Sequence, residues 1–307
     1  MPSTTELRQQ ITASIVQVLE NGGLPPWRKP WRCDANSGLP TNVVSKRRYS
    51  GINVLLLEAA SMRHGFESKF WATYRQWSEL GGQVKRRPAD IKPGQWGTNI
   101  VFFKPVKKTK INDAGEEHED RFFMMKSYTV FNVDQVEGPL DHLRVGQETD
   151  TRNDGEVIFE KAEEAIKATA ADIRYGGSRA FYDTNGDYIQ MPPRSSFSMT
   201  EFYESIAHEL VHWTEPSHRL AWDRKGEGYA AGELIAEIGG CFLCSELGLP
   251  TADNMTNHVA YLRNWLDAMK GDPKFIFRAS TQASKAVDFL LAFSRREVDQ
   301  PEPLIVV

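Results

Sequence analysis

Apolar residues one helical turn apart predict an amphipathic helix at the start of the chain, where Leu7, Ile11, Ile15 and Leu19 recur within residues 4–21. The same periodicity, interrupted by glycine and proline, predicts helices along both halves of the sequence. These helices are expected within residues 51–65, 71–82, 156–171, 198–214, 228–250, 256–270 and 275–296. In the helix at 198–214, Ser198 and Glu201 have the spacing of a capping box, which favours a helix start at that serine.

Two regions have the composition of β-hairpins. Residues 98–106 and 121–133 are rich in aromatic and β-branched side chains, and the charged stretch 107–120 between them is expected to be an exposed hairpin loop. Residues 179–193 are expected to form two short strands around the turn Asn185-Gly186. Together with the helices, these segments predict an α+β protein.

A change of pattern near the middle of the chain predicts two domains. Residues 137–155 have a polar, glycine-containing linker composition. We therefore expect one domain at 1–136, with helices beside a small sheet, and a second at 156–307, with a mixed sheet against its helices. At 307 residues the chain is long enough for each domain to have its own core.

The composition is that of a soluble protein, with 40% hydrophobic and 25% charged residues. The N-terminal segment lacks the apolar core of a signal peptide, and no run of about 18 apolar residues indicates a membrane span. The three cysteines are Cys33, Cys241 and Cys244, an odd and small number that favours a reducing, cytoplasmic location. Cys241 and Cys244 lie in an apolar helix and are predicted to be core residues.

The net charge of −4 conceals an asymmetry between the two halves. Residues 1–112 contain 18 Lys and Arg against 7 Asp and Glu, a balance of +11, and residues 113–307 contain 19 against 34, a balance of −15. A strongly basic half joined to an acidic half suggests that the basic half meets a polyanion.

The segment "IAHELVHWT" contains a pattern typical of metal sites. His208 and His212 lie four residues apart, so a helix presents both imidazoles on one face, while Glu209 lies about 100° around the axis. This H-E-x-x-H spacing suits two metal ligands and a general base. Two histidines in an ordinary core helix are the alternative.

A third ligand is expected from the helix "GELIAEIGG", where Glu233 and Glu237 also lie four residues apart on an otherwise apolar segment. One carboxylate would bind the metal and the other would support a ligand histidine; we expect Glu233 as the ligand and Glu237 in support, but the sequence allows the exchange. His218 is a rival third ligand. Two imidazoles and a carboxylate favour Zn²⁺, with Mn²⁺ or another divalent ion as alternatives.

The pattern resembles the zincin metallopeptidases that use two histidines and a downstream glutamate. In that chemistry Glu209 would accept a proton from water and pass it to the leaving amine. Tyr229 and His218 are candidate donors to an oxyanion. The strand 187–192 is expected to be the edge strand that holds a peptide substrate.

The basic half is also rich in tryptophan, in a pattern that suits single-stranded nucleic acid. Bases can stack on aromatic rings while phosphates meet Lys and Arg. The candidate DNA-binding residues are Trp27, Arg28, Lys29, Trp31, Arg32, Lys46, Arg47, Arg48, Trp71, Trp77, Lys85, Arg86 and Arg87. The alternative is that the tryptophans are core residues and the cations a solvated face.

Several segments in the same order resemble the ArdC family of plasmid antirestriction proteins and its relatives fused to TraC-type plasmid primases. The segments are "PPWRKPW", "YSGINVLLL", "FWATYRQWSELGGQV", "TNIVFFKP", "RAFYDTNGDYIQMPP", "AHELVHWT" and "GELIAEIGGCFLCSELG". The resemblance implies an N-terminal domain that binds single-stranded DNA, a C-terminal zincin-like metallopeptidase domain, and protection of incoming plasmid DNA from host restriction during conjugation. Gly232 replaces an acidic residue of the family pattern, and both glutamates of that pattern are kept.

Two other functions are compatible with the same residues. The protein could coat single-stranded DNA with a purely structural metal site, or it could be a stand-alone zinc metallopeptidase with a host protein as substrate. No membrane partner is expected.

Overall fold

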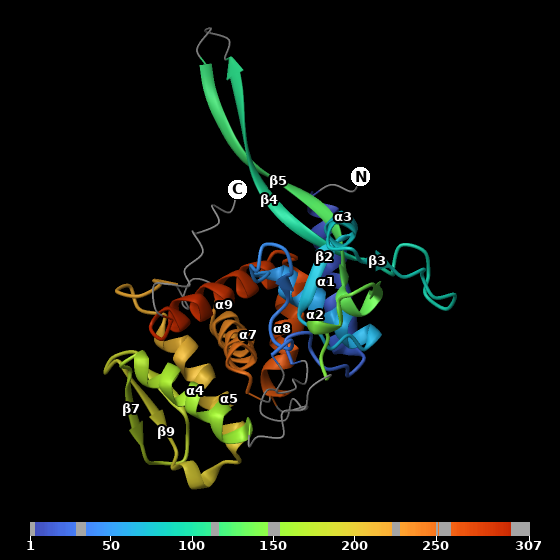
Figure 1. Cartoon of the computed structure of the whole chain (residues 1–307). Helices are drawn as coiled ribbons and strands as arrows, with labels where there is room; N and C mark the ends of the chain where they lie inside the picture. The colour runs from blue at the N-terminus through green and yellow to red at the C-terminus, as the bar shows by residue number, and fades with distance from the viewer. Residues whose placement is uncertain are drawn as a thin grey trace.

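The computed structural model describes residues 4–28, 35–111, 117–146, 154–222, 228–249, 251 and 259–295, without the side chains of 103–111, 117–124, 154–158 and 259–260. Within these residues the protein has mixed helices and strands, as the α+β prediction requires (Figure 1). Lys29, Trp31, Arg32 and Cys33 lie outside the described residues.

The first half combines helices with a four-stranded sheet of order β1-β2-β5-β4. Its elements are α1 (Thr4–Glu20), β1 (Thr41–Asn42), α2 (Ile52–His64), β2 (Phe70–Thr73), α3 (Tyr74–Glu79), β3 (Gln83–Val84), β4 (Thr98–Ile111), β5 (Glu117–Asn132) and β6 (Val136–Glu137). The buried face of α1 contains Ile11, Ile15 and Leu19, which the periodicity predicted. Gly65 ends α2 in the left-handed conformation with φ 71°, which a glycine adopts without a steric penalty.

The predicted hairpin of the first half is longer than its apolar residues indicate. β4 and β5 pair antiparallel from Thr98↔Val130 to Ile111↔Glu117, so most of the stretch 107–120 is strand and the prediction of a long loop was wrong. Figure 1 shows the two strands as an arm that projects from the body of the protein. Because the outer part of this arm projects away from the helices, it needs no apolar face, which accounts for its polar sequence.

The second half places a three-stranded sheet of order β7-β9-β8 against helices. Its elements are α4 (Asp154–Ala168), β7 (Asp172–Tyr175), β8 (Phe181–Asp183), β9 (Tyr188–Met191), α5 (Met199–Trp213), α7 (Tyr229–Leu247), α8 (Val259–Gly271) and α9 (Phe275–Ala292). The predicted hairpin is confirmed, because β8 and β9 pair antiparallel around Asn185-Gly186. β9 is also the central strand, so the expectation that residues 187–192 form the edge was wrong.

The start of α5 follows the predicted capping box. The Ser198 side chain accepts from the Glu201 backbone N–H, and the Glu201 carboxylate accepts from the Ser198 backbone N–H. This cap fixes the helical register of α5, and with it the direction in which residues 208 and 212 point.

The hydrophobic core runs through both halves of the chain. One cluster of buried residues contains Ile15 and Trp27 from the first half together with Phe202, Leu234 and Trp265 from the second. Two smaller clusters lie on the four-stranded sheet. The division at residues 137–155 therefore remains a prediction, while the packing joins α1 and α2 to the helices of the second half. In the described part of the chain, we find no helix with the length and apolarity needed to cross a membrane.

Candidate metal centre

Helices α5 and α7 pack closely because α7 has two glycines at the crossing. A Cβ at Gly240 would lie 3.2 Å from the backbone nitrogen of His208, and a Cβ at Gly239 would lie 2.8 Å from the Val211 side chain. Only a residue without a side chain permits this approach. The pair "GG" thus brings the acidic end of α7 beside the two histidines of α5.

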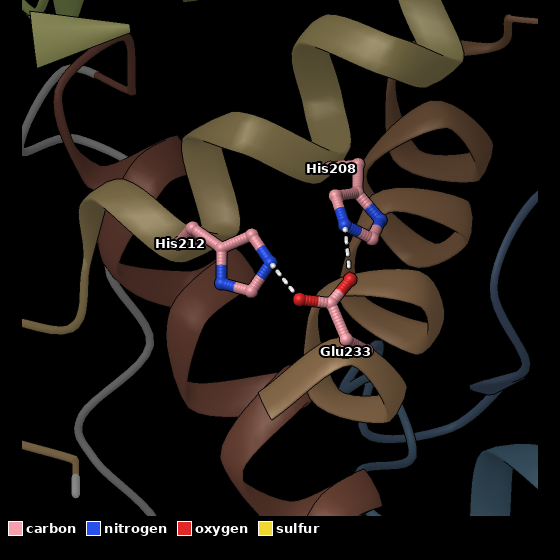
Figure 2. A group of neighbouring side chains, drawn as sticks. All are labelled: His208, His212 and Glu233. Carbon is pink, nitrogen blue, oxygen red and sulfur yellow. Dashed lines mark ion pairs between the residues drawn. The ribbon is translucent and has the colours of Figure 1, made fainter. Parts of the chain in front are cut away.

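Three side chains from these helices meet at one point. His208 Nε2 lies 3.5 Å from Glu233 Oε2, and His212 Nε2 lies 3.6 Å from Glu233 Oε1 (Figure 2). One donor atom from each of the three lies within 4.8 Å of the others, and no other such group of three is present among the described residues. The arrangement favours Glu233 over Glu237 as the third ligand.

The donor set fits a divalent transition metal. Two imidazole nitrogens and one carboxylate oxygen form a donor set common to catalytic zinc sites, which leave a further position open. His212 and Glu233 are buried and His208 is half-buried, so a cation or a protonated imidazole that faces Glu233 would compensate its buried charge. In the arrangement without a metal, burial disfavours protonation of His208, but Glu233 and the nearby carboxylates outweigh this and raise its pKa.

Glu215 supports His212 from the far side of the imidazole ring. Its Oε1 bonds to His212 Nδ1, and both side chains are buried. A carboxylate at Nδ1 holds the proton on that nitrogen and leaves Nε2 with its lone pair directed toward Glu233. Glu215 is not among the residues predicted from the sequence; the available signal was its position three residues after a ligand histidine, where the helix ends.

Glu209 lies beside the three converging side chains, as the sequence predicts for a general base. It is only 8% exposed and lines the same cleft as His208 and His212. Its carboxylate is not one of the three converging donors, which suits a residue that acts on water.

Glu237 was expected to support a ligand histidine, but it accepts hydrogen bonds from Arg28 and Trp27. It is 3% exposed and accepts hydrogen bonds from Arg28 Nε at 2.6 Å, Arg28 Nη2 at 3.2 Å and Trp27 Nε1 at 3.3 Å. The carboxylate that supports a ligand histidine in the expected way is that of Glu215.

Cys241 and Cys244 are free and buried, as predicted, and Cys241 lies beside Glu237.

The two candidate donors to an oxyanion, His218 and Tyr229, lie in different places relative to the cleft. His218 is 60% exposed and faces Asp187 at 3.5 Å, so it does not join the three donors. Tyr229 begins α7, lines the cleft, and places its hydroxyl 3.2 Å from that of Tyr261. Burial, the Tyr261 contact and the charge of Glu233 all raise the pKa of Tyr229, which therefore keeps its proton as a hydrogen-bond donor.

A cleft of about 580 Å³ opens over the three donors. Phe181 and Tyr182 of β8 line one wall, so the strand that borders the cleft is the edge strand β8. Glu201 and Glu204 of α5 line it further along the helix. The space suits an extended chain laid beside a sheet edge.

The prediction that tryptophan rings stack on DNA bases is wrong for Trp27, Trp71 and Trp77. Trp27 is 2% exposed, and Trp71 and Trp77 are fully buried. Trp77 donates to the Phe131 carbonyl at 2.9 Å, and Trp27 packs edge-on against Trp265. A ring enclosed in a core offers no face to a base, so these three residues are structural.

Two of the cations predicted to bind DNA, Arg28 and Arg48, instead form ion pairs within the protein. Arg28 is 3% exposed, and Arg48 forms ion pairs with Glu246 and Asp288, both at 2.7 Å. For Arg28 the DNA-binding prediction was wrong because its charge is buried. Lys46, Lys85, Arg86 and Arg87 are exposed and Arg47 is partly exposed.

The sheet carries an exposed aromatic pair that the sequence analysis did not select. Phe102 of β4 and Tyr128 of β5 are 44% and 47% exposed, with ring centroids 5.4 Å apart. Lys126 is exposed and lies directly opposite Phe102 in the strand register. Directly opposed residues share a sheet face, so a cation lies beside the two rings.

Two family models match the chain. Residues 5–131 match the N-terminal domain of anti-restriction factor ArdC, and residues 160–282 match a zincin-like metallopeptidase. The two ranges lie on either side of the predicted linker.

Two solved structures match nearly the whole chain. The metal-free structure of the antirestriction protein ArdC from plasmid R388 is 37% identical, with a TM-score of 0.74, and covers 94% of this chain and 99% of that one. Its Mn(II)-bound structure is 36% identical, with a TM-score of 0.70, and covers 95% and 99%.

Three related protein sequences also match most of this chain. The uncharacterised protein y4eC of Sinorhizobium fredii is 32% identical over 94% of this chain and 92% of its own length. Two DNA primases TraC of Escherichia coli are 34% and 33% identical over 94% and 95% of this chain. The chain spans only 20% and 28% of those primases.

Proposed function

The chain belongs to the ArdC family of antirestriction proteins, and on that premise we propose that it binds single-stranded DNA in the cytoplasm and protects incoming plasmid DNA from host restriction during conjugation. We propose further that its second half is a metal-dependent peptidase with a host protein as the candidate substrate. The match to a zincin-like metallopeptidase model supports this second part.

The convergence of His208, His212 and Glu233 is the observation that carries the peptidase proposal. A divalent ion held by these residues would supply Lewis acidity toward a peptide carbonyl and a water molecule. Zn²⁺ is favoured by the donor set, and the Mn(II)-bound structure of the R388 protein supports Mn²⁺ as an alternative.

The surrounding residues have separate tasks in peptide hydrolysis. The Glu209 carboxylate accepts the proton of the attacking water and returns it to the leaving nitrogen. The Tyr229 hydroxyl donates a hydrogen bond to the developing oxyanion. Glu215 keeps His212 in the tautomer that binds metal, and β8 holds the peptide backbone.

The exposed aromatic pair on the sheet carries the DNA-binding proposal. Single-stranded DNA needs exposed rings for its bases and nearby cations for its phosphates. Phe102 and Tyr128 provide the rings and Lys126 provides a cation, and all three side chains are exposed. The exposed cations Lys85, Arg86 and Arg87 add positive charge in the same half of the chain.

Fluorescence anisotropy with matched single- and double-stranded oligonucleotides, at two salt concentrations and with or without a chelator, tests DNA binding. We expect a preference for single strands that falls steeply with salt and does not depend on metal. Since a stacked base contributes about 1–3 kcal/mol, the double variant Phe102→Ala, Tyr128→Ala is expected to bind roughly tenfold or more weakly.

Tyr74→Ala is the matched control, because this tyrosine is 58% exposed on α3 and does not belong to the pair. Absence of binding by the wild-type protein would refute DNA binding as such. Normal binding by the double variant would refute only the choice of surface.

A further inference from the structure

Arg28 comes from the first half of the chain but contacts both metal-site helices of the second half. It follows α1 in a short buried segment, where its backbone N–H donates to the Pro25 carbonyl at 2.9 Å. Its side chain lines the cleft above the three metal-site residues. The metal site is therefore completed by a residue some 180 positions away in the sequence.

The guanidinium group is held by two carboxylates on different helices. Nε and Nη2 donate to the two oxygens of Glu237 on α7, at 2.6 and 3.2 Å. Nη1 lies 3.5 Å from Glu204 Oε1 on α5. A fork-shaped contact to both carboxylate oxygens fixes the orientation of Glu237 as well as its charge.

Glu237 lies near the three metal-site residues but is not one of the converging donors. It lies one helical turn from Glu233 on the same face of α7, and both carboxylates line the cleft. Hydrogen bonds from a charged donor are about twice as strong as neutral ones, so Arg28 restrains this carboxylate more strongly than the neutral Trp27 donor does.

We propose that Arg28 is a positioning residue that holds Glu237 out of the metal coordination sphere, so that the site keeps three protein ligands and one open position. This inference rests on the proposed metal site formed by His208, His212 and Glu233. It gives the first half of the chain a direct part in the chemistry of the second. If Glu237 joined these three ligands while the fourth position still held water, the metal would be five-coordinate.

The visible absorption of bound Co²⁺ tests the proposal, because its bands are stronger in four-coordinate than in five- or six-coordinate sites. The full chain is loaded with one equivalent of Co²⁺, and binding is followed in parallel by equilibrium dialysis. Removing the charge with Arg28→Met is expected to free Glu237 for the metal and weaken the bands. Arg28→Gln, which keeps one hydrogen-bond donor, is expected to weaken them in the same direction.

Four further variants separate this effect from a loss of stability. Glu237→Gln alone is expected to leave the wild-type spectrum unchanged, and adding it to Arg28→Met is expected to restore the wild-type bands. Arg28→Lys, which keeps the charge beside Glu237, is expected to retain most of the band intensity. Arg48→Met is the matched control, because Arg48 also joins the first half to α7, through Glu246 at 2.7 Å, but does not line the cleft.

The outcomes distinguish the possible failures. If the wild-type protein binds neither Co²⁺ nor Mn²⁺, the proposed metal site itself is refuted. If it binds Co²⁺ and both Arg28 variants keep its spectrum, or if Glu237→Gln alone changes it, only the role of Arg28 is refuted. If neither Arg28 variant folds with Co²⁺ present, Arg28 is a structural ion-pair residue and the positioning role is withdrawn.

Discussion

At the scale of single residues, the metal site depends on contacts that spacing alone does not reveal. His208 and His212 follow from their four-residue spacing, and Glu233 follows from the second acidic helix. Glu215 and Arg28 do not follow from any such pattern, yet they bond to His212 and Glu237. Partners that orient a ligand are selected by the packed geometry around it.

The first residue-scale prediction concerns the general base. Glu209→Gln is expected to lower peptidase activity by about 10²–10⁴-fold, because the amide cannot accept the proton of the attacking water. Metal affinity and DNA binding are expected to stay within about threefold of the wild type, since Glu209 is not one of the three converging donors. Single-turnover cleavage of an unfolded protein substrate, with metal content measured in parallel, checks this. Full activity in the variant would assign the proton transfer to another group.

The second residue-scale prediction concerns the support of His212. Glu215→Ala is expected to weaken metal binding about 10- to 100-fold, because the imidazole loses the carboxylate that fixes its tautomer. Competition with a chelator measures the affinity. Glu201→Gln serves as the control, because this glutamate also lies on α5 and lines the cleft but bonds to Ser198. Equal affinities for Glu215→Ala and the wild type would show that the His212–Glu215 contact does not serve metal binding.

At the scale of elements, the geometry of the site depends on how closely α5 and α7 approach. Gly240 faces the backbone of His208, and Gly239 faces the side chain of Val211. Without these two glycines, the helices would be farther apart and Glu233 would lie farther from both imidazoles. The outer part of the arm formed by β4 and β5 shows the converse case, since it projects away from the helices and its sequence is polar.

Gly240→Ala is therefore expected to destabilise the protein by about 1–3 kcal/mol and to weaken metal binding, because the new methyl group meets backbone rather than a movable side chain. Thermal unfolding and chelator competition measure the two effects. Gly271→Ala on α8 is the control, since no atom lies within 4 Å of its added Cβ. A Gly240→Ala protein with unchanged stability would show that α5 and α7 tolerate a wider spacing.

At the scale of the whole molecule, the two family matches describe parts that share one core. Trp27 packs against Trp265, and Arg48 joins the first half to α7 and α9. Such contacts are buried or paired, so separating the halves would expose apolar surface and leave the Glu237 carboxylate without its cation.

The whole chain is therefore expected to unfold in a single transition, and a fragment of residues 156–307 is expected to lack a cooperative one. Calorimetry of both proteins, with the metal present, checks this, using agreement between calorimetric and van't Hoff enthalpies as the criterion. Two resolved transitions in the whole chain, or a stably folded fragment, would establish the halves as independent units.

The sequence by itself determined the local features: the amphipathic helices, the capping box at Ser198, the turn at Asn185-Gly186 and the paired histidines. These depend on neighbours a few residues apart, which a linear pattern contains. The tertiary structure decided which tryptophans are buried, which strand borders the cleft, and that Arg28 pairs with Glu237. Burial and long-range ion pairs depend on segments that meet only when the core forms, so an isolated Trp-Arg motif could not distinguish a DNA contact from a structural one.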